Sequence, residues 1–236
     1  MIGLGRRVAA EAFGSAALAA IVIGSGVMAE RLAGGNVAVA LLGNTLATSA
    51  GLYVLIVAFA AVSGAHFNPA VTLVCWLRGE LRPREAGAYV VVQIVGMLIG
   101  VLLAHAMFEL PAWLPSTKPR PGAAQMLSEA VATFMLLVAV FGTRGRRVES
   151  AGAAVALAIA AGYWFTASTS FANPAITLAR ALSDTFAGIR IADVPAFVLG
   201  QLAGCLLAAG FCAWLFAADA PDQVPVDPAV PDQRGR

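Results

Sequence analysis

The 236-residue sequence has few charged residues, few cysteines and histidines, and almost no lysine. Charged side chains make up 12% of the chain and hydrophobic ones 60%, so most of its length cannot form a water-compatible surface. This balance excludes an ordinary soluble domain and indicates a protein that crosses the membrane several times. The single lysine among fifteen basic residues and the abundance of alanine suggest a GC-rich bacterial source, so we expect a bacterial plasma-membrane protein.

Cysteine and histidine are too sparse to build the sites they usually form. Cys75, Cys205 and Cys212 lie in apolar sequence, and an odd number without pairing spacing argues against a disulfide framework. His66 and His105 are 39 residues apart, with no carboxylate or cysteine at metal-ligand spacing. The sequence also lacks a nucleophile–base constellation and a glycine-rich phosphate loop. We therefore expect no metal, no cofactor and no enzymatic activity.

Six apolar runs are long enough to cross a bilayer core, which takes about 20 residues. They cover residues 8 to 28, 37 to 62, 86 to 108, 124 to 142, 150 to 168 and 194 to 218. The first run follows Arg6-Arg7 and has the outline of a signal peptide, but Glu11 interrupts it and a later run matches it. The predicted fold class is an all-α membrane protein with six transmembrane helices.

One tripeptide occurs twice within this apolar sequence. The two copies are Asn68, Pro69, Ala70 and Asn173, Pro174, Ala175, and each is followed by a hydrophobic residue and threonine. Asparagine caps free N–H groups and proline fits the first helical turn, so each copy predicts the start of a helix. Residues 66 to 77 and 171 to 182 are too short to cross the membrane. We read them as re-entrant loops with half helices, which are tolerated where they line a solute path.

The two halves of the chain repeat each other. Glutamate precedes glycine by 13 residues at 11 to 24 and at 129 to 142, and Gln-x-x-Gly occurs at 93 to 96 and at 201 to 204. An odd number of spans in each half inverts the second copy and brings the N-termini of both half helices together at the midplane. The positive ends of their dipoles then disfavour a cation or a relayed proton. We predict one domain over residues 1 to 218, with repeats at about 8 to 108 and 124 to 218, and a disordered cytoplasmic tail over residues 219 to 236.

The distribution of basic residues predicts the orientation. With the N-terminus inside, ten of the fifteen lie on the cytoplasmic side: Arg6, Arg7, Arg78, Arg82, Arg84, Arg144, Arg146, Arg147, Arg234 and Arg236. The outer segments hold Arg31, Lys118, Arg120, Arg180 and Arg190. Both termini are therefore predicted to be cytoplasmic, and the net charge of +2 gives no indication of a nucleic-acid partner.

The segment Ser63-Gly-Ala-His-Phe-Asn-Pro-Ala-Val-Thr72, the second Asn-Pro-Ala and the paired glutamates resemble the aquaporin and aquaglyceroporin (major intrinsic protein) family over about residues 8 to 218. The resemblance implies a bundle of six tilted helices and two half helices, a pore within each subunit and a homotetramer in the lipid bilayer. It also implies that Glu11 and Glu129 anchor the re-entrant loops and that His66 lines the pore. A proton relay is the alternative role for the glutamates. Backbone carbonyls of residues 64 to 67 and 169 to 172 are expected to line the path.

The sequence departs from the family at the selectivity filter. Most members have an arginine directly after the second Asn-Pro-Ala, where this chain has Ile176. The resemblance, carried over by spacing from the two motifs, implies that Thr48, Ala161 and Ser170 hold the other filter positions. A ring of such small side chains predicts a wide pore for water and small neutral solutes such as glycerol or undissociated arsenous acid. With an aliphatic residue at this position, the sequence resembles a bacterial subgroup of the family that is associated with arsenic resistance.

Arg180, four residues after Ile176, is predicted to face the outer vestibule or to pair with Asp184 at the next helical step. Three alternatives to a wide channel stay open: a water-selective aquaporin, an ion-coupled secondary transporter, and a non-conducting adhesion protein.

Overall fold

Eight α-helices and one short 3₁₀ turn form the part of the chain, residues 2–217, that this computed structural model describes. The six long helices are α1 (Leu4–Leu32), α2 (Val37–Ser63), α4 (Pro83–Met107), α5 (Ala123–Gly142), α6 (Val148–Phe165) and α8 (Val194–Leu215). All six are long and apolar enough to cross a membrane, and each overlaps one of the predicted spans. The predicted tail, residues 219 to 236, lies outside the described residues.

Two short helices, α3 (Pro69–Leu77) and α7 (Pro174–Arg180), begin within the bundle at the two Asn-Pro-Ala motifs. Asn68 Oδ1 accepts a hydrogen bond from the Ala70 N–H at 2.8 Å, and Asn173 Oδ1 accepts one from the Ala175 N–H at 3.0 Å. Proline occupies the first turn of both helices, where its missing N–H has no partner to lose. The two motifs therefore start half helices, as the sequence predicts.

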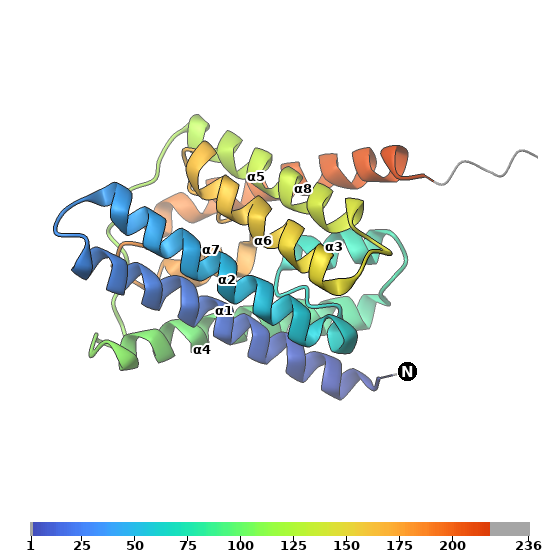
Figure 1. The fold of residues 1–236 in the computed structure, drawn as a ribbon, viewed down its shortest axis with the longest axis horizontal. Coiled ribbons are helices and arrows are strands. Elements are labelled where there is room, and N and C mark those ends of the chain that lie inside the picture. The colour runs from blue at the N-terminus through green and yellow to red at the C-terminus, as the bar shows by residue number, and fades with distance from the viewer. Residues whose placement is uncertain (1, 218–236) are drawn as a thin grey trace, which may run out of the picture.

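Small residues allow the long helices to cross closely. A Cβ added at Gly96 or Gly100 of α4 would collide with backbone carbonyls of α1, and one added at Gly200 or Gly204 of α8 would collide with carbonyls of α5. The pair α1 and α4 is thus repeated by α5 and α8, as expected for two related halves. In Figure 1 the N-terminus and the end of α8 lie at the same end of the bundle.

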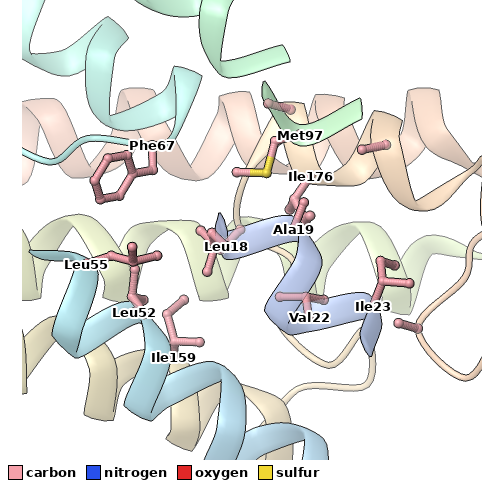
Figure 2. Close-up of a cluster of buried hydrophobic side chains, with 14 of the residues drawn as sticks. Leu18, Ala19, Val22, Ile23, Leu52, Leu55, Phe67, Met97, Ile159 and Ile176 are labelled. Carbon is pink, nitrogen blue, oxygen red and sulfur yellow. The ribbon is translucent and has the colours of Figure 1, made fainter. Parts of the chain in front are cut away.

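The apolar interior surrounds a cavity instead of filling the bundle. Six buried side chains of the main hydrophobic cluster also line this cavity and are labelled in Figure 2: Leu18, Val22, Leu52, Phe67, Ile159 and Ile176. Large apolar side chains on the outside, such as Phe13, Leu46, Leu157 and Trp214, are more than half exposed. A lipid environment accounts for that exposure, since apolar side chains are stable against lipid acyl chains but costly to expose to water.

Candidate functional site

An internal cavity of about 460 Å³ runs through the bundle and contacts both half helices. Its lining begins at the loop between α5 and α6, where it includes Arg144, and extends to Arg180 at the end of α7. Asn68 and Asn173 both line it, and His66 lines it beside the first motif. The remaining walls come mainly from α1, α2 and α6 and are largely apolar.

The two half helices are joined by reciprocal hydrogen bonds between the repeats. Asn68 Nδ2 donates to the carbonyl of Ala172 at 2.8 Å, and Asn173 Nδ2 donates to the carbonyl of Phe67 at 2.8 Å. Each asparagine therefore caps its own half helix with its oxygen and holds the opposite loop with its nitrogen. An amide has two N–H donors, so one donor of each asparagine is left for a solute in the cavity.

The loops before the half helices have an unusual backbone. Ala65 and Phe67 in the first loop and Ser170 and Ala172 in the second have φ between +48° and +51°. Residues with side chains rarely adopt this left-handed region, and they persist there only when surrounding contacts enforce it. Residues of both loops line the cavity, so this backbone is part of the site.

The buried glutamates provide the contacts that hold these loops. Glu129 accepts hydrogen bonds from the N–H groups of Phe171 and Ala172 at 2.9 and 2.8 Å and from Gln201 Nε2 at 2.6 Å. Glutamates inside a membrane are costly unless several donors satisfy them. Each of its acceptor atoms is engaged by the loop or by α8.

The first repeat has the same arrangement with one more donor. Glu11 accepts from the N–H groups of His66 and Phe67 at 2.9 and 2.7 Å, from Ser63 Oγ at 2.6 Å and from Gln93 Nε2 at 2.8 Å. Neither glutamate is solvent-exposed, and neither lines the cavity.

Sequence reasoning gave no role to the glutamine and threonine that complete each anchor. Gln93 Nε2 also donates to Thr72 Oγ1 at 2.9 Å, and Gln201 Nε2 donates to Thr177 Oγ1 at 2.7 Å. Each glutamine thus ties a long helix to a half helix and to the glutamate. The sequence signal for the two glutamines is the repeated Gln-x-x-Gly. Its two copies are separated by nearly the same number of residues as the two Asn-Pro-Ala motifs.

The predicted filter residue Ala161 is misplaced. It is exposed on the outer face of α6 and does not line the cavity, whereas Tyr163, buried on the inner face, does. The cavity face of α6 follows a four-residue period through Ala151, Val155, Ile159 and Tyr163. Counting back from the second motif assumed the wrong length for the segment between α6 and α7, and the helical period would have identified Tyr163.

Tyr163 adds an aromatic side chain to the cavity wall beside the predicted filter residues. Thr48, Ser170 and Ile176 all line the cavity, as their spacing indicated, and the Tyr163 hydroxyl lies 3.5 Å from Thr48 Oγ1. The ring of four small side chains expected from the sequence is therefore wrong in one member. An aromatic ring with a hydroxyl group occupies one side of it.

Arg180 lines the same cavity at the end of α7. Its side chain is buried, its Nε donates to the carbonyl of Ala187, and its guanidinium carbon is 3.3 Å from the centroid of the Phe171 ring. The expected alternative pairing with Asp184 does not occur. Asp184 instead accepts hydrogen bonds from the N–H and Oγ1 of Thr117, because the loop before α5 folds over the end of α7.

Two more cations lie in the loop before α5. Arg120 donates to the carbonyls of Ser168 and Gly188 at 3.0 and 2.9 Å, and burial lowers its pKa to about 10. Lys118 donates to the carbonyl of Phe186 at 2.6 Å. Burial and the nearby charges of Arg120 and Arg180 lower the pKa of Lys118 to about 8. The end of the site at α7 thus gathers positive charge.

An ion-pair cluster lies at the other end of the cavity, beside the loop between α5 and α6. Arg144, from the loop after α5, pairs with Glu80, and its Nη2 lies 3.3 Å from Cys75 Sγ. Glu80 also pairs with Arg78 at 3.1 Å. Burial favours the neutral carboxyl, but the hydrogen bond and charge of Arg144 outweigh it and hold the pKa of Glu80 below its usual value.

Six spanning helices, two inverted half helices and a cavity between them define a membrane channel of the aquaporin fold, which confirms the fold class predicted from the sequence. The chain belongs to the major intrinsic protein family, whose model matches residues 2–167. It is 49% identical to "Aquaglyceroporin AqpS" of Rhizobium meliloti (strain 1021) over 219 residues, covering 92% of this chain and 93% of the relative. It is 29% identical to "Probable aquaporin AqpM" of Archaeoglobus fulgidus, covering 90% and 96% of the two chains.

A solved structure supports the fold independently. The X-ray structure of the aquaglyceroporin from Plasmodium falciparum matches with a TM-score of 0.66 at 22% identity, covering 90% of this chain and 95% of that one. At this identity the likeness bears on the fold alone.

Proposed function

We propose that this protein is a passive channel for water and small neutral solutes, with glycerol and undissociated arsenous acid as representative solutes. The observation that carries the proposal is one continuous cavity, which extends from Arg144 to Arg180 and is lined by both Asn68 and Asn173. Family membership and the 49% identical relative, which is named as an aquaglyceroporin, support the same solute class.

The paired half helices supply the chemistry of passage. The N-termini of α3 and α7 present the positive ends of their dipoles near the asparagines, which disfavours cations and protons at that point. The free amide donors of Asn68 and Asn173 and loop carbonyls of residues 64 to 67 and 169 to 172 replace part of the hydration of a neutral solute. His66 adds a polar group to the inner half of the path.

The filter consists of Thr48, Tyr163, Ser170 and Ile176. Three hydroxyl groups and one aliphatic wall suit a solute that has both hydroxyls and a hydrocarbon face, as a polyol has. Ile176 stands where most of the family has arginine, so no guanidinium crosses the ring at that level.

Stopped-flow measurements in proteoliposomes test this proposal. We expect water, glycerol and arsenous acid to enter in proportion to their gradients, with no dependence on pH or Na⁺. Flux driven by a Na⁺ or H⁺ gradient would instead identify an ion-coupled transporter. The absence of any flux would contradict the channel and favour a non-conducting role.

A water-selective channel is the second candidate, and Tyr163 favours it because its ring narrows the filter. Water flow without glycerol or arsenous acid flow in the same assay would establish this alternative and exclude the wider channel.

We also propose a homotetramer with both termini in the cytoplasm. The abundance of basic residues at the end of the bundle that holds the N-terminus and the end of α8 supports this orientation. Native mass spectrometry in detergent tests the tetramer, and cysteine accessibility of residues introduced at each end tests the orientation.

A further inference from the structure

Arg180 places a positive charge in the cavity wall that forms no ion pair within residues 2–217. It lines the cavity although its side chain is only 2% exposed. It is absent from the ion pairs found among residues 2–217, and Asp184, the closest acidic residue in sequence, is engaged by Thr117. A buried guanidinium without a counter-ion is costly, so a contact or a function must account for it.

The guanidinium is held in a fixed position. The ring of Phe171 and the carbonyl of Ala187 contact it from two directions. Phe171 is itself fixed, since its N–H donates to Glu129 and its ring packs edge-on against Phe197 at 5.0 Å. The loop anchor of the second repeat therefore also positions the charge.

Arg180 occupies a different level of the pore from the usual filter position. Ile176 and Arg180 both line the cavity and are four residues apart on α7, which corresponds to one turn or about 6 Å along the helix. The Cα atom of Arg180 thus lies one helical turn beyond that of Ile176.

We propose that Arg180 is the specificity-determining residue that excludes cations and protons at the outer end of the channel and donates hydrogen bonds to entering solutes. This inference rests on the proposed channel function. A fixed charge in a narrow, low-dielectric passage repels cations much more strongly than it would in water. The charge is thus supplied by a residue one helical turn after Ile176, the position at which most of the family has arginine.

The test compares Arg180→Gln with Arg180→Lys in proteoliposomes made from the full chain. Cation leak is measured as Na⁺ and H⁺ entry under an imposed inside-negative potential. We expect Arg180→Gln to raise the leak by about tenfold or more, since a like-charged passage changes local ion concentration by at least that factor. Arg180→Lys keeps the charge and should leak like the wild type.

The chain offers a matched control. Arg120 also stacks on Phe171, with its guanidinium carbon 4.9 Å from the ring centroid, but it does not line the cavity. Arg120→Gln removes a charge from the same end but not from the cavity wall, so it is expected to raise the leak far less than Arg180→Gln does. Equal leak from Arg180→Gln and Arg120→Gln would overturn the inference.

Two further measurements keep the result decisive. Water flow through Arg180→Gln shows that the variant still forms a pore. If that variant does not assemble, the double variant Ile176→Arg, Arg180→Leu moves the charge back one turn and should exclude cations, whereas Arg180→Leu alone should leak. A leak from both would overturn the inference. Failure of the proposed function is distinguishable, because it appears as absent water and glycerol flux in the wild type.

Discussion

The two buried glutamates satisfy their charge through loop N–H groups. Glu129 accepts hydrogen bonds from the N–H groups of Phe171 and Ala172 and from the side-chain amide of Gln201. It does not line the cavity. Glu11 has the equivalent contacts in the first repeat. We therefore interpret both glutamates as loop anchors rather than members of a proton relay.

Replacing Glu129 by glutamine should destabilise the fold. The NH2 of the new amide group faces N–H groups that also need an acceptor. We expect the free energy of unfolding to fall by about 2 to 4 kcal/mol, as for an unsatisfied buried group in a charged hydrogen-bond network. The measurement is thermal unfolding in detergent together with water permeability. Glu149→Gln, at an exposed ion pair with Arg147, is the control and should change stability by about 0.5 kcal/mol or less. Equal effects of the two substitutions would argue against the anchor.

Tyr163 should limit the size of solutes that pass. Tyr163→Ala removes the aromatic wall of the filter, so we expect glycerol flux to rise more than water flux, measured by stopped-flow light scattering. Trp164→Ala is the control, since Trp164 is the next residue on α6 but is 50% exposed on the outside of the bundle. An unchanged ratio of glycerol to water flux in Tyr163→Ala would show that the restriction lies elsewhere.

At the scale of elements, the long helices cross where glycine lets backbones approach. Gly204 on α8 faces the carbonyl of Ala130 on α5, and Gly96 on α4 faces the carbonyl of Ala12 on α1. These crossings set the positions of Glu129 and Gln201, and of Glu11 and Gln93, because all four lie on the same helix pairs. Helix packing therefore controls the geometry of the loops.

A methyl group at this crossing should disturb it. Gly204→Ala places a Cβ against backbone atoms that cannot move away easily, so we expect a loss of about 1 to 3 kcal/mol from overpacking. Gly210→Ala lies on the same helix with open space at the Cβ position and should be neutral or slightly stabilising. Thermal unfolding of both variants in the same detergent decides between them, and a neutral Gly204→Ala would contradict the close crossing.

At the scale of the whole molecule, the two ends of the pore differ in charge. Near the loop between α5 and α6, Arg78 and Arg144 pair with Glu80, whereas at the α7 end Arg180, Arg120 and Lys118 donate to backbone carbonyls. The two repeats therefore form a nearly symmetric centre, whereas the two ends of the cavity differ in charge.

Lys118 should make stability depend on pH at the alkaline end. Its pKa in the folded protein is about 8, below the ordinary value of 10.5, so the unfolded chain holds this proton more tightly between those values. Stability should therefore rise as pH increases through this window, and the full penalty should persist below pH 8.

Thermal unfolding of the wild type and of Lys118→Met at pH 7 and pH 10 isolates this group from others that titrate. We expect the midpoint of the wild type to rise relative to the variant between the two pH values. A constant difference would mean that Lys118 is not desolvated in the folded protein.

The sequence alone determined the class of structure. Hydropathy gives the six spans, and Asn68 and Asn173 before proline give the half helices, because capping and helix length are local properties of the chain. The repeated glutamates and Gln-x-x-Gly spacing indicated the inverted repeat. These features depend on residue type and interval, which the sequence shows directly.

Only the tertiary structure decided which side chains meet at the filter. Thr48, Ser170 and Ile176 were located by their distance from the motifs, but Tyr163 was missed in favour of Ala161. Which face of α6 turns inward depends on where the helix ends and how the following loop folds. Likewise, the sequence allows Arg180 either to pair with Asp184 or to line the cavity. The loop before α5 decides between the two, because its Thr117 donates hydrogen bonds to the Asp184 carboxylate. Contacts between distant segments set both outcomes, and no local interval in the sequence determines them.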